Sequence, residues 1–372
     1  MECIKPFFFD MTPAEKAELQ DYYRVILDTG TLILGPFTKR FEDEFANYIG
    51  TRYAVSVNSG TSALEILCRI HGFKGKKIGV PTNTNFATVA AIIRAGGEPV
   101  YLDMSVETYC PTLEMVKAAH QHEKITGLLW VHIGGIITPD FDKIVEYCKT
   151  QHIILIEDAA HAHGSEFKQK KAGNFADGGA FSFFPTKVMT TYEGGMITTN
   201  DEDVMQLAKS YRNQGKGSAD YGNYHTEFGN SWRMLEVSAA LGLIQLRKLD
   251  HMLDKRQQVV EKVIPILKEL KINYCDTSHM NRASNYKFII RHESSRNLAE
   301  IKESFKQRGV ILGGGVYEIP CHLQPVFKAI KIPNSGLATA EKYCPRQICL
   351  PITSGLSTQE EKQLQEAIYQ VM

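Results

Sequence analysis

The chain has 372 residues, and its 42 Lys and Arg balance its 42 Asp and Glu, so the formal net charge at neutral pH is zero. This balance argues against a nucleic-acid-binding protein, which needs excess positive charge to neutralise phosphates, and against a polybasic membrane-surface protein. With 43% apolar and 23% charged residues, the composition is that of a globular protein and favours a large enzyme.

From about residue 51 to residue 199, short apolar runs alternate with longer amphipathic segments. The runs predict strands over residues 53–57, 77–80, 99–103, 127–131 and 152–156. This alternation is typical of βαβ units and predicts an α/β fold with a mostly parallel sheet. Because each strand is an almost unbroken apolar run, we expect helices on both faces of the sheet. Ligand sites in such sheets lie beyond the carboxyl ends of the strands.

A long helical pattern follows from Glu236 to about Leu270, although Pro265 is expected to kink it or end it early. After it come a predicted strand over 285–290, a helix over 297–308 and a glycine-rich loop at 313–315. We therefore predict a large domain over residues 1–250 and a smaller α+β C-terminal domain over residues 251–372.

The sequence gives no indication of a membrane-spanning segment or a signal peptide. No segment reaches the roughly 18 consecutive apolar residues of a membrane-spanning helix. The apolar run at residues 7–9 stops at Asp10, which is too short for a signal peptide, so we expect a cytoplasmic protein. The eight cysteines form no C-x-x-C motif and are expected to be free thiols.

The strand at 152–156 leads into Glu157-Asp158-Ala-Ala-His161-Ala-His163-Gly164. Two carboxylates at the carboxyl end of a buried strand, followed by imidazoles, place titratable groups where such sheets bind ligands. One carboxylate could pair with a cationic ring nitrogen. Alternatively, Glu157 and Asp158 cap the following turn.

Lys187 is a lone cation in a stretch of aromatic, small and hydroxyl residues from 178 to 199, which also contains Ser182. An apolar setting favours the neutral amine that forms Schiff bases. The alternative is a solvated surface lysine, the usual place for this residue type.

Asn58-Ser59-Gly60-Thr61-Ser62-Ala63 stands between a predicted strand and a predicted helix. Hydroxyls and free backbone N–H groups at a helix start suit a phosphate, although a simple helix cap fits equally well. The segment is neither a Walker loop nor a G-x-G-x-x-G fingerprint. Phe86 follows the second strand, where its ring could stack on a planar cofactor or belong to the core. A phosphate cradle, a stacking ring, a strand-end Asp and a Lys together match the parts of pyridoxal 5'-phosphate.

These motifs resemble the DegT/StrS family of sugar aminotransferases, which have the aspartate-aminotransferase fold. The resemblance runs from Leu34-Gly35-Pro36 to Leu350-Pro351-Ile352. It implies that Lys187 binds pyridoxal 5'-phosphate as a Schiff base and that Asp158 pairs with the pyridinium nitrogen. His161 takes a place, often Gln in the family, beside the cofactor's phenolic oxygen.

The resemblance also implies that Phe86 stacks on the cofactor ring and that Gly60, Thr61 and Ser182 hold its phosphate. Family members are typically homodimers whose active sites take a residue from the partner subunit. That residue is usually the Asn of an N-Y-R-M motif, whereas this chain reads Gly229-Asn230-Ser231-Trp232-Arg233-Met234. Ser231 aligns with the family Asn and Asn230 precedes it, so both are candidates.

A second departure follows the lysine, where the family pattern T-x-G-E-G-G has Tyr192 in place of the first glycine. On the substrate side, the resemblance suggests Tyr317 and His322, whose alternative role is packing. Arg233 is a further candidate for holding a phosphorylated substrate.

The implied reaction moves an amino group from L-glutamate, less often L-glutamine, to a keto sugar that is usually nucleotide-linked, with ping-pong kinetics. A phosphorylated small ketone or a keto cyclitol would fit the same catalytic residues. A sugar dehydratase of the same fold is disfavoured, because such relatives have histidine in place of Lys187. A metal-dependent hydrolase would rest on His161-x-His163 with Glu157 or Asp158, a weak motif. A non-catalytic protein of this fold would be expected to lack Lys187 or Asp158.

Overall fold

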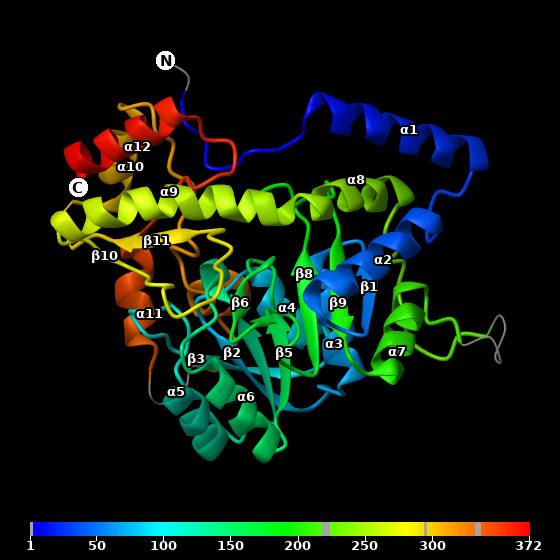
Figure 1. The fold of residues 1–372 in the computed structure, drawn as a ribbon. Helices are drawn as coiled ribbons and strands as arrows, with labels where there is room; N and C mark the ends of the chain where they lie inside the picture. The colour runs from blue at the N-terminus through cyan, green and yellow to red at the C-terminus, as the bar shows by residue number, and fades with distance from the viewer. Residues whose placement is uncertain (1–2, 218–223, 294–295, 332–335) are drawn as a thin grey trace.

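The computed structural model describes residues 3–217, 224–293, 296–331 and 336–372 (Figure 1). Within these residues, seven strands form one central sheet in the order β1-β9-β8-β5-β4-β2-β3. The strands are β1 (Tyr53–Val57), β2 (Lys77–Pro81), β3 (Glu98–Leu102), β4 (Gly127–Val131), β5 (Ile154–Asp158), β8 (Gly178–Ser182) and β9 (Gly195–Thr199). In this sheet β9 pairs antiparallel with both β1 and β8, and the other neighbouring strands pair parallel. The predicted α/β fold with a mostly parallel sheet is therefore confirmed.

Helices cover both faces of this sheet. They include α3 (Gly60–Ile70), α4 (Phe86–Arg94), α5 (Leu113–Ala118), α6 (Phe141–Thr150) and α7 (Glu202–Arg212). In β4, Leu128 and Trp130 belong to one buried apolar cluster and Leu129 belongs to another. Since successive side chains of a strand point to opposite faces, the two clusters are the cores on the two sides of the sheet.

The helical pattern from 236 to 270 forms two helices, α8 (Glu236–Arg247) and α9 (Leu249–Glu269), rather than the single one predicted. The break lies at Lys248, whose backbone angles (φ −108°, ψ 6°) leave the helical range. Pro265 lies inside α9, which continues past it to Glu269. Figure 1 shows α8 and α9 running end to end along one side of the molecule. The buried Glu236 carboxylate accepts backbone N–H groups of Gly35, Phe37 and Thr38, and so caps α2 (Pro36–Ile49).

The C-terminal part contains a small antiparallel sheet of β10 (Asn273–Tyr274), β11 (Phe288–Arg291) and β12 (Gln347–Leu350). It packs with α9, α10 (Leu298–Lys306) and α12 (Thr358–Val371) around a third apolar cluster. The predicted strand at 285–290 starts later, at Phe288, because Asn285 has a left-handed backbone (φ 47°). The division into two domains at residue 250 stays a prediction.

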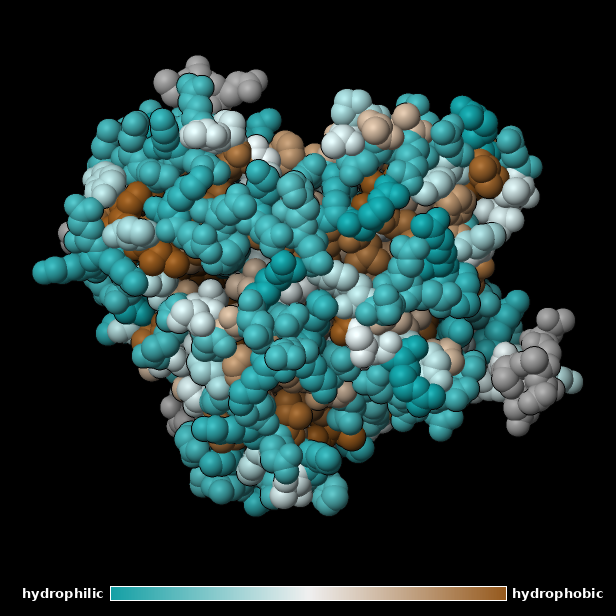
Figure 2. Space-filling view, in the orientation of Figure 1, coloured by the Kyte–Doolittle hydropathy of each residue, from teal (hydrophilic) through white to brown (hydrophobic). Residues whose placement is uncertain are grey.

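The remaining elements are α1 (Pro13–Thr29), α11 (Ala338–Tyr343) and the hairpin of β6 (Glu166–Phe167) and β7 (Lys170–Lys171). The eight cysteines are free, and all except Cys3 are buried. The face of the molecule seen in Figure 2 is mostly hydrophilic, with small apolar areas between. Among the helices described, none has the length and apolar character needed to cross a membrane.

Candidate active site

A cavity of about 730 Å³ lies at the carboxyl ends of the parallel strands. Its wall includes Val131 at the end of β4, Asp158 at the end of β5 and Ser182 at the end of β8. Residues that the sequence singled out and that line this cavity are Gly60, Thr61, Asp158, His161, Ser182, Lys187 and Tyr317. Segments far apart in the sequence thus meet at the edge of the sheet where α/β folds bind ligands.

At one end of the cavity, the start of α3 touches the end of β8. The Ser59 hydroxyl caps α3 by accepting the Ser62 N–H at 3.1 Å. A Cβ on Gly60 would lie 2.7 Å from Cβ of Ser182, so only glycine allows this approach. The first N–H groups of a helix and the Thr61 and Ser182 hydroxyls therefore border the same space, which suits an anionic group.

Asp158 has a buried carboxylate without a cationic partner within salt-bridge distance among the described residues. Its Oδ2 accepts the Thr88 hydroxyl at 2.8 Å and its Oδ1 accepts the Ala160 N–H at 3.2 Å. Burial raises the pKa of Asp158, and the Thr88 hydrogen bond opposes that shift. A ligand with a positively charged nitrogen would supply the missing charge. Thr88 was not singled out by the sequence, which gave no reason to choose it among the threonines of its segment.

The neighbouring Glu157 is fully buried and points away from the cavity. Its carboxylate accepts the backbone N–H groups of Gly173, Phe175 and Ala176 at 2.8, 2.7 and 3.1 Å, and Oε2 lies 2.9 Å from His132 Nε2. Glu157 thus holds the segment before β8 against β5. Of the two carboxylates, it is therefore Asp158 that faces the cavity.

Replacing Glu157 with glutamine is expected to lower the free energy of unfolding by about 2–3 kcal/mol. The amide NH₂ would face backbone donors and leave buried N–H groups unpaired. Chemical denaturation measures the change, and Glu146→Gln on the exposed side of α6 is the matched control, with an expected effect below about 0.5 kcal/mol. Equal denaturation midpoints for Glu157→Gln and Glu146→Gln would contradict a structural role for Glu157.

The imidazoles give the metal-hydrolase alternative no ligand set. His163 is buried between the rings of Phe181 and Phe183, with centroids 5.4 and 5.7 Å away, and does not line the cavity. Burial and the charge of Lys187 lower its pKa to about 3. Within the described ranges, no three His, Cys, Asp or Glu side chains are grouped to hold a metal ion.

His161 and Tyr317 form a polar wall of the cavity. The Gly134 N–H donates to His161 Nδ1 at 3.3 Å, so the imidazole proton is on Nε2, which lies 3.3 Å from the Tyr317 hydroxyl oxygen and can donate to it. Burial and the charge of Lys187 hold the pKa of His161 well below its usual value. Burial and the charge of Asp158 raise the pKa of Tyr317 well above its usual value. Tyr317 therefore keeps a hydroxyl proton that it can donate to a bound ligand.

Phe86 does not line the cavity. It is the first residue of α4, its ring is half-exposed, and it stacks on Phe327 with centroids 5.4 Å apart. Asn85 and Ala87 line the cavity instead. The reason is the helix start: the Asn85 side chain caps α4 by accepting the Ala87 N–H, and the first turn directs Phe86 elsewhere. A stacking role for Phe86 has no support in this geometry.

The other substrate candidate, His322, lies outside the cavity wall. It is buried, with Nδ1 2.6 Å from the Thr82 hydroxyl and Nε2 3.2 Å from Glu341, an arrangement typical of a packing residue. Asn230 and Ser231 are exposed and likewise lie away from this chain's own cavity. Arg233 donates to Ser231 at 2.5 Å and to Asn213 at 2.9 Å.

Tyr192 has a left-handed backbone with φ 68°. This conformation costs a non-glycine residue roughly 1–2 kcal/mol, which explains why the family pattern has glycine where this chain has Tyr192. The Tyr192 hydroxyl lies 3.1 Å from that of Tyr23 in α1, so the bulky ring ties the loop after Lys187 to α1. The next residue, Glu193, lines the cavity.

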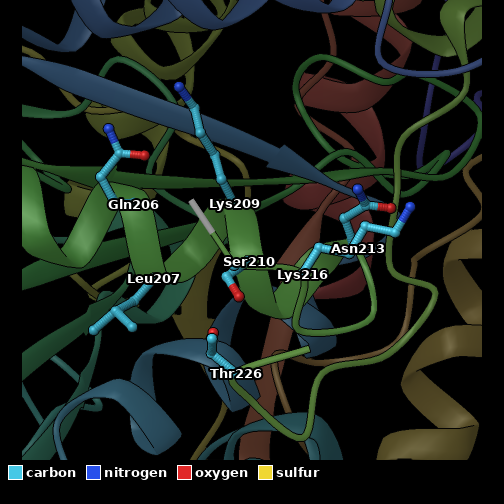
Figure 3. A pocket seen from close by; sticks show the side chains of 8 residues that line it. Gln206, Leu207, Lys209, Ser210, Asn213, Lys216 and Thr226 are labelled. Carbon is cyan, nitrogen blue, oxygen red and sulfur yellow. The ribbon is translucent and has the colours of Figure 1, made fainter. Parts of the chain in front are cut away.

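A second cavity, of about 460 Å³, lies between α7 and the segment around Thr226 (Figure 3). Its wall contains Lys209, Ser210 and Lys216, and none of its lining residues is a carboxylate or an imidazole. It therefore lacks the Asp–Lys combination of the first cavity and is not the candidate site.

Comparisons with known proteins identify the family of this chain. The family model of the DegT/DnrJ/EryC1/StrS aminotransferase family matches residues 13–369. GDP-perosamine synthase of Escherichia coli O157:H7 is 29% identical over 96% of both chains. The dTDP-3-amino-3,4,6-trideoxy-alpha-D-glucose transaminase of Micromonospora megalomicea subsp. nigra is 27% identical, again over 96% of both chains. A candidate sugar aminotransferase of Streptococcus pneumoniae, solved in its PLP form, is 25% identical, with a TM-score of 0.85 over 98% of both chains.

Proposed function

The chain belongs to the DegT/DnrJ/EryC1/StrS aminotransferase family, and from this premise we propose that it transfers an amino group from L-glutamate to a nucleotide-linked keto sugar. The family makes it a pyridoxal 5'-phosphate-dependent aminotransferase. The observation that carries the proposal is the presence of Asp158 and Lys187 in one cavity with the start of α3.

The residues of the cavity fit pyridoxal 5'-phosphate. Gly60, Thr61 and Ser182 would hold the phosphate at the start of α3, and the buried Asp158 would pair with the ring nitrogen. Lys187 would carry the cofactor as a Schiff base. When bound, the cofactor supplies a ring that takes up the electrons released at the amino acid's Cα.

The chain's own groups would perform the proton transfers. The Lys187 amine, released by the incoming amino acid, takes the proton from Cα of that amino acid and later returns a proton, as general base and then general acid. The negative charge of Asp158 keeps the ring nitrogen protonated. The Tyr317 hydroxyl, oriented by His161, donates a hydrogen bond to the bound molecule.

The names of two relatives support a nucleotide-linked sugar as the acceptor, because they refer to a GDP-linked and a dTDP-linked sugar. Because these nucleotides differ, the proposal names the class of acceptor and not one nucleotide. With zero net charge, the protein offers no overall attraction for a diphosphate, so local groups must hold it. Arg233 is proposed as one of these groups.

We further propose that two copies of the chain form the complete site. Leu32, Ile33 and Leu235 lie together through an isolated bridge between residues 33 and 235, and they are 57%, 42% and 52% exposed. Phe228, close in the sequence to Asn230 and Ser231, is 95% exposed. Apolar groups exposed in this way favour a protein partner. A second copy on this surface would bring Asn230 or Ser231 to the partner's cavity.

A ketone screen tests the proposed acceptor. The amine form of the cofactor is loaded on the enzyme, which is then mixed with nucleotide-linked keto sugars, phosphorylated small ketones and keto cyclitols. We expect the visible absorbance of the Schiff-base form of the cofactor to return at least about tenfold faster with a nucleotide-linked keto sugar than with the other ketones. Only this class of acceptor can use contacts to the nucleotide. A faster return with a phosphorylated ketone or a cyclitol would reject the proposed substrate class.

A further inference from the structure

Tyr286 stands against the lysine loop, although it lies 100 residues away from that loop in the sequence. Its hydroxyl is 3.1 Å from the Thr186 hydroxyl, and Nζ of Lys187 lies over its ring, 4.9 Å from the centroid. The half-buried Tyr286 thus touches two consecutive residues of the loop that carries the candidate Schiff-base lysine.

The position of Tyr286 is fixed by its own neighbours. Its backbone N–H donates to the Ser284 hydroxyl at 3.3 Å, and that hydroxyl donates to the His161 carbonyl at 2.7 Å. The preceding Asn285 has a left-handed backbone, and its carbonyl accepts the buried guanidinium of Arg256 at 3.1 Å. A strained residue held from several sides is common at functional sites.

The surroundings of the ring are rich in positive charge. Besides Lys187, Nζ of Lys287 lies 5.4 Å from the centroid of the Tyr286 ring. The His161 ring also packs against the Tyr286 ring, with centroids 4.6 Å apart. Burial alone would raise the pKa of Tyr286, but the charges of Lys187 and Lys287 and the bond with Thr186 bring it below its ordinary value. Burial is the largest single influence, and the nearby charges and the hydrogen bond together outweigh it.

Among the residues that the structure describes, Lys187 has no other partner that could hold its amine. Across the described residues, no carboxylate lies within salt-bridge distance of Nζ and no hydrogen bond restrains it. The ring face of Tyr286 is therefore the group that holds the amine at the cavity wall. An ammonium over an aromatic face is attracted by the ring's quadrupole, most strongly where water is excluded.

We propose that Tyr286 is a positioning residue for Lys187: its ring face holds the lysine amine, and its hydroxyl fixes the adjacent Thr186. This inference rests on the proposed function, in which Lys187 forms the Schiff base. The ring would hold the ammonium form of Lys187 at the cavity wall of the cofactor-free protein, so that formation of the Schiff base begins from one defined position.

The test follows the reaction of cofactor-free protein with pyridoxal 5'-phosphate, using the rise in visible absorbance and the borohydride-reducible adduct at Lys187. Tyr286→Leu removes the ring and is expected to slow adduct formation roughly tenfold. Tyr286→Phe keeps the ring and loses only the hydroxyl, so a loss of about threefold is expected. Thr186→Val removes the same hydrogen bond and should match Tyr286→Phe.

Tyr274→Leu is the matched control, because it removes a ring from β10, a strand of the small sheet whose strand β11 begins two residues after Tyr286. It should react at the wild-type rate. If the melting temperature of Tyr286→Leu lies far below that of this control, Tyr286→Met takes its place, because the flexible methionine side chain fills irregular space without a ring.

Two outcomes are distinguishable. Equal rates for Tyr286→Leu and wild type, or equal losses for Tyr286→Leu and Tyr286→Phe, would overturn the positioning role alone. A wild-type protein without an adduct at Lys187 would overturn the proposed function and the positioning role together.

Discussion

Replacing Lys187 with alanine is expected to lower the rate of amino transfer by at least about 1,000-fold, because the substitution removes both the Schiff-base amine and the general base. The measurement is the rate at which the amino group moves from L-glutamate to the keto acceptor, followed together with the visible absorbance of the cofactor. The folded state should be unaffected, since Lys187 makes no ion pair with any residue that the structure describes.

Lys209→Ala is the matched control for this experiment. Lys209 also lines a cavity, but that cavity lies beside α7 and contains no carboxylate. The control should transfer the amino group at close to the wild-type rate. A Lys187→Ala enzyme with more than about one tenth of wild-type activity would show that another group performs the proton transfer.

Asp158→Asn is expected to reduce amino transfer by about 100- to 1,000-fold, the second largest effect. Asparagine keeps the size of the side chain and can still accept the Thr88 hydroxyl, but it has no negative charge to hold a proton on the ring nitrogen. The kinetic signature is a fall in kcat, with the Lys187 adduct still formed.

Asp177→Asn tests whether the effect belongs to the site. Asp177 accepts the Leu155 N–H at 2.8 Å near the start of β5, whereas Asp158 is at its end. The control removes a carboxylate from the far edge of the sheet and should leave kcat within about twofold. Comparable losses in both variants would argue against a cofactor role for Asp158.

The central sheet could be predicted because its strands are buried on both faces and read as continuous apolar runs. The place of Asp158 followed from the same pattern, since it ends β5, whereas β8, which ends at Ser182, was not among the predicted strands. The residue pattern alone could not separate Glu157 from Asp158, and it was the family resemblance that selected Asp158. The period of two along a strand sends adjacent side chains to opposite faces, and only the structure shows which face borders the cavity.

Other features escaped prediction for local reasons. Asn85 lines the cavity where Phe86 was expected, because α4 begins at Phe86, and helix starts are uncertain by a residue or more in sequence patterns. The break between α8 and α9 could not be predicted, because Lys248 and its immediate neighbours include neither proline nor glycine. Tyr286 carries no motif, and it reaches Lys187 only through the tertiary fold.

The most direct test of the role of Lys187 is borohydride reduction of the purified wild-type protein in the presence of pyridoxal 5'-phosphate, followed by peptide mass mapping. The reduced cofactor is predicted on the peptide that contains Lys187, with loss of the visible absorbance. Label on a different lysine, or no cofactor label at all, would contradict the assignment of Lys187.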